Sequence, residues 1–381
     1  MTTKTVADIN QYSGSSVNPL EHPEQLYELY SVPSFETGYP EIVKGKDIGS
    51  TKITVEEGDV LVCKINPRIN RVWVVKHNTE YPLLASSEWI VVRNKNIDSN
   101  YLKWYFSSPT FRTLLNSQVA GIGGSLTRAQ PKQVAKYPVP VPNFLKQQKV
   151  SKSLDKVNGL IALRKEQLAK LDQLVKSRFI ELFGDPVSNP HGYPKVPLSE
   201  LAEIKIGPFG SLLHKEDYIA NGHALVNPSH IVAGKISVDN ELTVSEEKYS
   251  ELSAYHLQVG DVVMGRRGEM GRCAVVQTDG LLCGTGSLLI RTKGDVTADY
   301  LQKIISFPSF KKTIEDMAVG QTMPNLNVPI VSRFQIIKPP IEVQEAYYAF
   351  VEQTDKSKLA IQHSLDKLEL LKKSLMQEYF G

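Results

Sequence analysis

The sequence predicts an α/β (α+β) protein with an internal pseudo-twofold repeat: two globular domains separated by two long helices that pair as an antiparallel coiled coil. Three observations support this prediction. A hairpin-like segment occurs at residues 55–75 and again at 257–276. Each half of the chain ends in a heptad segment nearly forty residues long, and the two segments close alike, SRFIELFGD at 177–185 and SLMQEYFG at 374–381. An internal repeat constrains the architecture of the whole chain more strongly than any local pattern does.

Each hairpin begins with Gly-Asp-Val, at residues 58–60 and 260–262, inside an apolar stretch. A group of cationic and amide side chains follows, and a second apolar stretch comes after it. Two apolar runs joined by a short polar segment are typical of a β-hairpin. We therefore expect two hairpins with polar tips. The segments 44–48 (KGKDI) and 227–231 (NPSHI) precede the hairpins, and we expect them to occupy corresponding places.

The repeat continues after each hairpin. Residues 105–115 and 304–314 are amphipathic helical segments interrupted by a Ser-Pro or Phe-Pro turn, and residues 119–131 and 318–329 are loops of small and polar residues. A proline-containing segment then leads into each long helix, at 137–148 and at 336–345. Proline is compatible with an edge strand and with a helix start, so we expect a strand followed by the first turn of the helix. The second half begins after a linker rich in proline and glycine, 183–194.

Apolar residues in both long segments recur at alternating steps of three and four, which is a heptad seam. The seam residues that we expect to make the helix contact are Leu154, Val157, Ile161, Leu168, Leu171, Val175, Val351, Ile361, Leu365, Leu368 and Leu375. A helix of this length spans ~60 Å, more than one domain usually covers, so each helix is expected to pair with the other one. The predicted domain limits are 1–143, 144–184 (first helix), 185–340 and 341–381 (second helix).

The composition is that of a water-soluble globular protein. Of its 381 residues, 41% are hydrophobic and 22% are charged, and no run of eighteen apolar residues could span a bilayer. The three cysteines, Cys63, Cys273 and Cys283, are an odd number without metal-ligand spacing, which favours a reducing, cytoplasmic compartment. The net charge of +3 is too small to identify a polyanionic partner. Any argument for nucleic-acid binding must therefore rest on where the cations lie.

The polar hairpin tips and neighbouring loops are the candidate binding surface. Arginine can read guanine, asparagine and glutamine can read adenine, and a carboxylate can accept from cytosine, while any cation can neutralise phosphate. Two such modules on a rigid spacer suit double-stranded DNA. The candidate DNA-binding residues are Lys44, Lys46, Lys64, Asn66, Arg68, Asn70, Arg71, Arg128, Gln130, Asn227, Ser229, His230, Arg266, Arg267, Glu269, Arg272, Gln321, Thr322 and Asn325. Among them, His230 is expected at the surface and not on a metal, since no suitable second ligand is spaced near it.

No catalytic set is evident in the sequence. An adenine methyltransferase requires an Asp/Asn-Pro-Pro-aromatic segment and a glycine-rich turn for the methyl donor, and neither is present. A Walker lysine motif and a cluster of carboxylates for magnesium are also missing. Two other classes stay open: a DNA enzyme with unrecognised motifs, and a coiled-coil scaffold that does not bind DNA.

The combination of VKGKDI, GDVLVCKINPRINRVWVV, NPSHIVAGKIS, GDVVMGRRGEMGRCAVV, MPNLN and FGDPVSNP resembles the specificity (S) subunits of type I restriction-modification systems over nearly the whole chain. The resemblance implies two target-recognition domains that each read half of a split, asymmetric DNA site, with the helices setting the spacer. It also implies partners: modification subunits that carry the adenine methyltransferase, and restriction subunits that translocate DNA. The chain itself would bind no cofactor, and S-adenosylmethionine, ATP and Mg²⁺ would act on the partner subunits.

The two halves also differ. The second module has nineteen more residues than the first between NPSHI or KGKDI and its Gly-Asp-Val, and the segment 206–222 has no clear counterpart in residues 1–40. We therefore expect the two domains to read different sequences. An orphan DNA-binding or scaffold protein without an active modification partner is the alternative reading.

Overall fold

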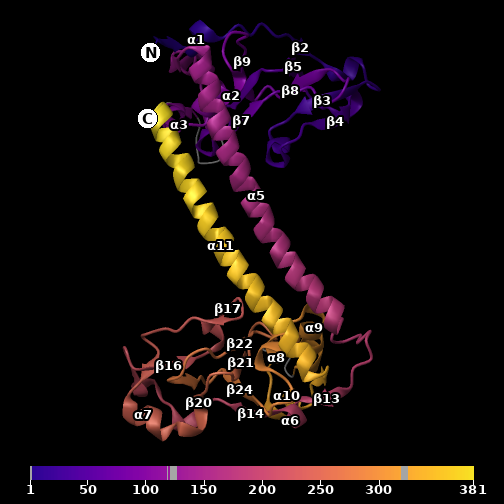
Figure 1. Ribbon diagram of the computed structural model, residues 1–381, viewed down its shortest axis with the longest axis vertical. Helices are drawn as coiled ribbons and strands as arrows, with labels where there is room; N and C mark the ends of the chain where they lie inside the picture. Colours follow the sequence, from indigo (N-terminus) through magenta and orange to yellow (C-terminus); the bar gives the residue numbers. More distant parts are fainter. Residues whose placement is uncertain (1, 118, 121–126, 319–324) are drawn as a thin grey trace. The chain divides into compact units, whose positions relative to one another are not determined.

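The computed structural model describes residues 2–117, 119–120, 127–318 and 325–381. The chain forms two compact units (Figure 1). Unit 1 comprises residues 1–167 and 361–381, and unit 2 comprises residues 168–360, so each unit contains part of both long helices. Among the described residues, no helix has a stretch long and apolar enough to cross a membrane.

Unit 1 combines small sheets with short helices. A five-stranded sheet has the order β2-β5-β8-β3-β4, and a three-stranded sheet has the order β7-β6-β9; β1 pairs with β12, and β10 pairs with β11. The strands are β1 (Thr2–Thr5), β2 (Ser16–Val17), β3 (Leu26–Tyr30), β4 (Glu41–Lys44), β5 (Lys52–Thr54), β6 (Val60–Cys63), β7 (Val72–Val74), β8 (Leu83–Ala85), β9 (Trp89–Val92), β10 (Val119–Ala120), β11 (Arg128–Ala129) and β12 (Pro138–Val141). The short helices are α1 (Val6–Ile9), α2 (Ser99–Phe106), α3 (Pro109–Ser117) and α4 (Pro131–Val134).

Unit 2 repeats this plan. Its five-stranded sheet has the order β15-β19-β16-β23-β20 and its four-stranded sheet the order β14-β24-β21-β22, while β13 pairs with β25 and β17 with β18. The strands are β13 (Lys195–Pro197), β14 (Ala202–Ile206), β15 (Tyr218–Ile219), β16 (His223–Val226), β17 (Ile231–Val232), β18 (Lys235–Ile236), β19 (Thr243–Val244), β20 (His256–Leu257), β21 (Val262–Gly265), β22 (Cys273–Val275), β23 (Leu281–Cys283), β24 (Ser287–Thr292) and β25 (Gln335–Ile337). The short helices are α6 (Leu198–Leu201), α7 (Glu246–Glu251), α8 (Ala298–Ile305), α9 (Pro308–Met317) and α10 (Val328–Ser332).

Strand pairing corrects one predicted correspondence between the halves. The strand β3 is parallel to β8, and β16 is parallel to β23, so β3 and β16 are the equivalent strands. The segment 227–231 follows β16, and its counterpart is therefore 31–35 after β3, whereas 44–48 follows the antiparallel strand β4. The expectation that 44–48 and 227–231 correspond was wrong, because both precede a hairpin in the sequence but follow different strands of the sheet.

The hairpins themselves are equivalent in detail. The strand β6 pairs antiparallel with β7 and β9, and β21 pairs antiparallel with β22 and β24. Asp59 and Asp261 of the two Gly-Asp-Val segments are buried, with 1% and 2% of their surface exposed. The Nε and Nη2 atoms of Arg93 lie 2.7 Å from the two carboxylate oxygens of Asp59, and Arg291 binds Asp261 in the same way at 2.8 and 2.7 Å. The aspartates are therefore structural.

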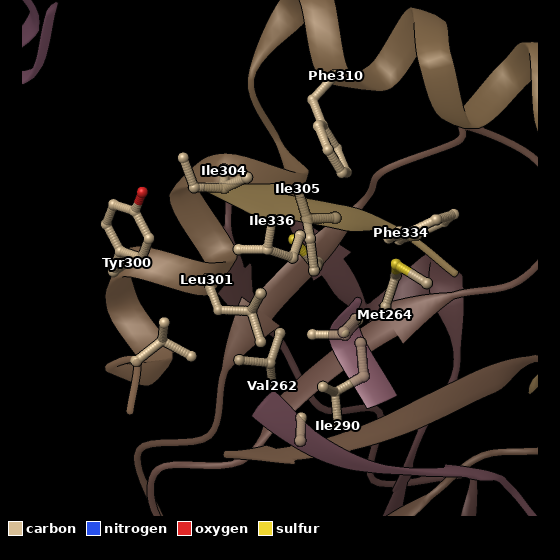
Figure 2. Packing of buried hydrophobic residues seen from close by; sticks show 14 of the residues in the cluster. Val262, Met264, Ile290, Tyr300, Leu301, Ile304, Ile305, Phe310, Phe334 and Ile336 are labelled. Carbon is tan, nitrogen blue, oxygen red and sulfur yellow. The ribbon is translucent and has the colours of Figure 1, made fainter. Parts of the chain in front are cut away.

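The apolar core of unit 2 lies between the four-stranded sheet and the helix pair α8 and α9 (Figure 2). Leu301 and Ile305 of α8 point toward the sheet residues Val262 and Ile290, Ile304 belongs to the same cluster, and all five residues are almost completely buried. Figure 2 also shows Phe310, Phe334 and Ile336 closing the same cluster. Unit 1 has the equivalent core between its three-stranded sheet and α2 and α3. All three cysteines are free and buried: Cys63 in β6, Cys273 in β22 and Cys283 in β23.

The long helices α5 (Phe144–Phe183) and α11 (Ile341–Phe380) pack against each other within each unit. In unit 1, Lys372 Nζ donates to Asn158 Oδ1 at 2.7 Å and Lys165 lies 2.9 Å from Glu369. In unit 2, Lys358 lies 2.7 Å from Asp172. The start of each helix thus meets the end of the other, which confirms the predicted antiparallel pairing.

The predicted seam residues are all buried or half-buried. Exposed apolar residues such as Leu163, Leu359 and Leu370 lie off the seam.

Candidate nucleic-acid interface

The tip of the first hairpin is a short 3-10 turn, Pro67–Ile69, between two asparagines in the left-handed backbone conformation. Asn66 has φ 48° and Asn70 has φ 49°, a region that asparagine tolerates better than most residues. The Nδ2 atom of Asn70 donates to the carbonyl of Phe106 at 3.1 Å and fixes the tip to α2. Arg68 is exposed at the apex and has no hydrogen bond or ion pair among the described residues.

The segment after residue 126 completes this surface. Asn66 N donates to Thr127 O at 2.9 Å, and Ala129 N donates to Lys64 O at 2.8 Å, so Arg128 lies beside the first hairpin. The guanidinium of Arg128 lies 3.2 Å from a carboxylate oxygen of Glu88, and Gln130 is exposed nearby. The structure therefore brings together residues that are more than fifty positions apart in the sequence.

The second hairpin tip has an equivalent arrangement. Leu326 N donates to Arg266 O at 2.9 Å, Arg267 forms a β-bridge with Asn325, and Arg266 Nε donates to Asn325 Oδ1 at 3.1 Å. Arg267 is exposed, and within the described part of the chain its side chain has no hydrogen bond or ion pair. Gln321 and Thr322, also candidates, lie outside the described residues.

The remaining charged residues of the second tip bind one another. Glu269 accepts from Arg272 at 2.7 Å and from Lys311 at 2.9 Å, and these hydrogen bonds lower the pKa of Glu269 to about 2. Arg272 also donates from Nη1 to the carbonyl of Pro228 at 3.2 Å. The sequence did not predict Lys311 as a residue of this surface. The only feature that could have indicated it is the pair of adjacent lysines, Lys311 and Lys312, after Phe310.

Among the other candidates, His230 is buried with 7% of its surface exposed, and its Nδ1 lies 2.8 Å from the carbonyl of Leu225. The expectation of a surface or DNA-facing histidine was wrong, because the Asn-Pro-Ser-His turn folds the ring back against β16. Asn227 is half-buried and accepts weakly from Gly286 N at 3.4 Å, whereas Ser229 is exposed.

Ion pairs also hold the cations of the first unit's outer loops. Lys44 and Lys46 lie 2.8 and 3.0 Å from the two oxygens of Glu24. Arg71 lies 3.0 Å from Glu36, and half-buried Lys64 has no such partner in the described residues. Among the described candidates, the cations that are free to meet a ligand are therefore Lys64, Arg68 and Arg267. Arg266 would have to give up its hydrogen bond to Asn325, and the other lysines and arginines would have to exchange a carboxylate for the ligand.

The described residues offer no metal-binding cluster of three or more His, Cys, Asp or Glu side chains. Both tips instead present arginine and amide groups on a rigid, hydrogen-bonded hairpin. Such groups can donate to phosphate oxygens and to the acceptor edges of bases. The assignment of individual residues to DNA stays a prediction.

Comparison with known proteins points to one class. Residues 190–371 match the family model for the type I restriction modification DNA specificity domain. The whole chain is similar to a chain from a structure of the assembly and conformational transition of the type I R-M system, with 17% identity and a TM-score of 0.64, covering 100% of this chain and 97% of that one.

Two solved specificity subunits are also similar to this chain over its whole length. The HsdS subunit from Thermoanaerobacter tengcongensis is 17% identical, with a TM-score of 0.51, and the type I restriction-modification S subunit from M. genitalium is 12% identical, with a TM-score of 0.53. Each similarity covers 100% of this chain and 96% of the other. At these identities the structural likeness concerns the fold.

Proposed function

The chain belongs to the family of type I restriction-modification DNA specificity subunits, and from that premise we propose that it recognises a split, asymmetric DNA site and directs partner subunits to it. A specificity subunit is the non-catalytic component of its complex. We assign residues 1–143 and 185–340 to the two target-recognition domains and residues 144–184 and 341–381 to the spacer helices.

The observation that carries this proposal is the recurrence of an exposed arginine at each hairpin tip, Arg68 and Arg267, to which the described residues offer no hydrogen bond or ion pair. Because the hairpins are equivalent, each domain is expected to recognise one half of the DNA site. Because the residues at the two tips differ, the two half-sites are expected to differ in base sequence. An exposed arginine can donate two hydrogen bonds to guanine in the major groove. In this proposal the surrounding ion-paired cations contact phosphate.

The proposed partners follow from the family. Modification subunits would supply the adenine methyltransferase with S-adenosylmethionine, and restriction subunits would supply ATP- and Mg²⁺-dependent translocation and cleavage. The proposed location is the cytoplasm, where host and invading DNA are both accessible. An alternative, an orphan protein without an active modification partner, predicts no methylation at all.

The test is a map of adenine methylation in cells that carry or lack this gene together with the modification subunit from its locus. We expect one split motif to lose methylation when the gene is deleted. In Arg68→Ala or Arg267→Ala chains, the methylated sites should tolerate more bases in one half of the motif, while the other half keeps its sequence. The reason is that a lost bidentate contact costs about 1–3 kcal/mol of discrimination between bases. An unchanged methylome after deletion would contradict the proposal.

A further inference from the structure

An exposed phenylalanine, Phe209, lies in the loop that follows β14. Its side chain is 60% exposed, and it belongs to none of the apolar clusters that the described residues form. Within the described part of the chain, its ring has no aromatic or cationic neighbour. Single exposed apolar side chains are common on protein surfaces, so exposure alone assigns no role to this residue.

The backbone is constrained on both sides of Phe209. Gly207 approaches the neighbouring loop so closely that a Cβ atom there would lie 2.0 Å from the carbonyl oxygen of Gly284. Pro208 is buried, and its ring restricts φ. Gly210 has φ 65°, in the left-handed region that favours glycine. The loop therefore combines a restricted backbone with an aromatic side chain that it leaves in solvent.

The register of the four-stranded sheet places Phe209 at the same edge as the second hairpin tip. The strands β14 and β21 lie on either side of β24 and run antiparallel to it, so both end where β24 begins (Figure 1). Gly207 N donates to Ser287 O at 3.1 Å, and Gly265 pairs with Ser287 from the other side. Phe209 and Arg267 each follow two residues later. Because these two segments are separated by two strand spacings, they leave the sheet about 10 Å apart.

This pair of side chains matches two different groups of the DNA major groove. Arg267 is exposed, and the described residues offer it no hydrogen bond or ion pair, so its guanidinium can donate to guanine. A phenyl ring gains nothing from phosphate oxygens, and the apolar group that the major groove exposes is the 5-methyl group of thymine. A separation of about 10 Å corresponds to roughly three base pairs at a rise of about 3.4 Å.

We propose that Phe209 packs against the 5-methyl group of one thymine in the half-site of unit 2, within about three base pairs of the base pair that Arg267 contacts. The proposal rests on the proposed function and adds a specificity-determining residue to it. The segment 206–222 has no clear counterpart in residues 1–40. The contact is therefore expected in only one half of the split site.

The experiment measures binding of the chain, in complex with the modification subunit from its locus, to duplexes that carry the methylated motif. The half of the motif that tolerates more bases in Arg267→Ala cells is the half-site of unit 2. In that half each thymine is replaced in turn by uracil, which removes the 5-methyl group and keeps the base pair. We expect one replacement, within about three base pairs of the position that depends on Arg267, to raise the Kd about fourfold. This factor corresponds to one methyl group buried at the interface.

Variants of the loop assign the effect to Phe209. The Phe209→Ala complex should bind the thymine and uracil duplexes equally, with a Kd about tenfold above that of the wild type on thymine. Phe209→Leu keeps an apolar side chain and should still prefer thymine. Val259→Ala is the matched control, because Val259 is 56% exposed and precedes β21 at the opposite end of the same sheet. This control should keep the wild-type Kd and the preference for thymine.

The possible outcomes separate this inference from the proposed function. Equal binding of all thymine and uracil duplexes by the wild type would overturn the thymine contact and leave the proposed function intact. A thymine preference that persists in Phe209→Ala would assign the methyl contact to another residue and also overturn the inference. So would a Phe209→Ala chain that binds DNA like the wild type but loses the modification subunit, because Phe209 would then belong to a protein interface. A wild-type complex without affinity for the motif would contradict the proposed function itself.

Discussion

Asp59 and Asp261 are the residues that explain why the Gly-Asp-Val segment occurs in both halves of the chain. Each carboxylate accepts two hydrogen bonds from one guanidinium and one from a backbone N–H three residues earlier, Glu56 N at 2.8 Å and Gln258 N at 2.7 Å. Such a carboxylate joins the entry of the hairpin to the neighbouring strand. The repeat therefore preserves a structural ion pair, while the residues that differ between the copies lie at the tips.

We predict that Asp261→Asn destabilises unit 2 by about 2–4 kcal/mol, because it leaves the guanidinium of Arg291 without its anion in a mostly buried site. Chemical denaturation of the wild-type and variant chains measures the difference. Glu247→Gln, an exposed carboxylate on α7, is the control and should stay within ~0.5 kcal/mol of the wild type. An equally small effect for Asp261→Asn would refute the structural role.

At the scale of elements, α7 is a helix of unit 2 without a counterpart among the described residues of unit 1. Aromatic stacking attaches it to the sheet. The ring of Tyr249 on α7 lies between those of His223 and His256, with centroid distances of 3.8 and 3.7 Å. Glu246, in the first turn of α7, lies 2.7 Å from Nε2 of His223. The hydrogen bond to Glu246 is the largest cause that raises the pKa of His223 above 6.5.

We predict that the attachment of α7 weakens with rising pH. A group whose pKa is raised by folding contributes stability that is complete below its unfolded pKa, 6.5, and that is lost as the pH rises through the folded value. Amide hydrogen exchange in α7, corrected for intrinsic rates, should therefore show less protection at pH 8.5 than at pH 6. Glu246→Gln should remove this pH dependence, and an unchanged dependence in that variant would contradict the assignment.

Long elements were predictable from the sequence because heptad spacing over forty residues leaves few alternatives, and the structure confirms the pairing of α5 and α11. The two hairpins were also predictable, and the pairs β6–β7 and β21–β22 confirm them. The partners of most other short strands were not. Strands of two to four residues carry little periodicity, and the parallel partner of β16 is more than fifty residues away. For the same reason the burial of His230 and the Glu269–Lys311 contact could not be read from spacing, since both depend on which strands become neighbours.

At the scale of the whole chain, the two continuous helices connect the repeated halves, and each helix contributes to both units. Glutamines at equivalent positions tie the first turn of each long helix to its unit. Gln147 Oε1 accepts from Asp98 N at 2.9 Å, and Gln344 Oε1 accepts from Thr297 N at 3.0 Å. Because the helix starts are anchored in this way, a change in helix length should be transmitted to the attached domain.

We predict that four residues inserted next to Ala169, an exposed position of α5, widen the unread spacer of the methylation motif by about one to two base pairs. The insertion adds ~6 Å of helix, and base pairs rise by about 3.4 Å. Methylome sequencing should show unchanged half-sites with the longer spacer. A four-residue insertion next to exposed Val238 should leave the spacer as it is, and an unchanged spacer in the α5 variant would contradict the role of the helices as a ruler.

The burial of every cysteine has a practical consequence for biophysical work on this protein. Burial raises the pKa of Cys273 and of Cys283 to about 12, and Cys63 is only 1% exposed, so thiol reagents should not modify the folded chain at neutral pH. New cysteines introduced at Arg68 and Arg267 would then be the only reactive sites, without removal of native ones. A spin label on each would report the distance between the two hairpin tips directly, with and without a DNA duplex.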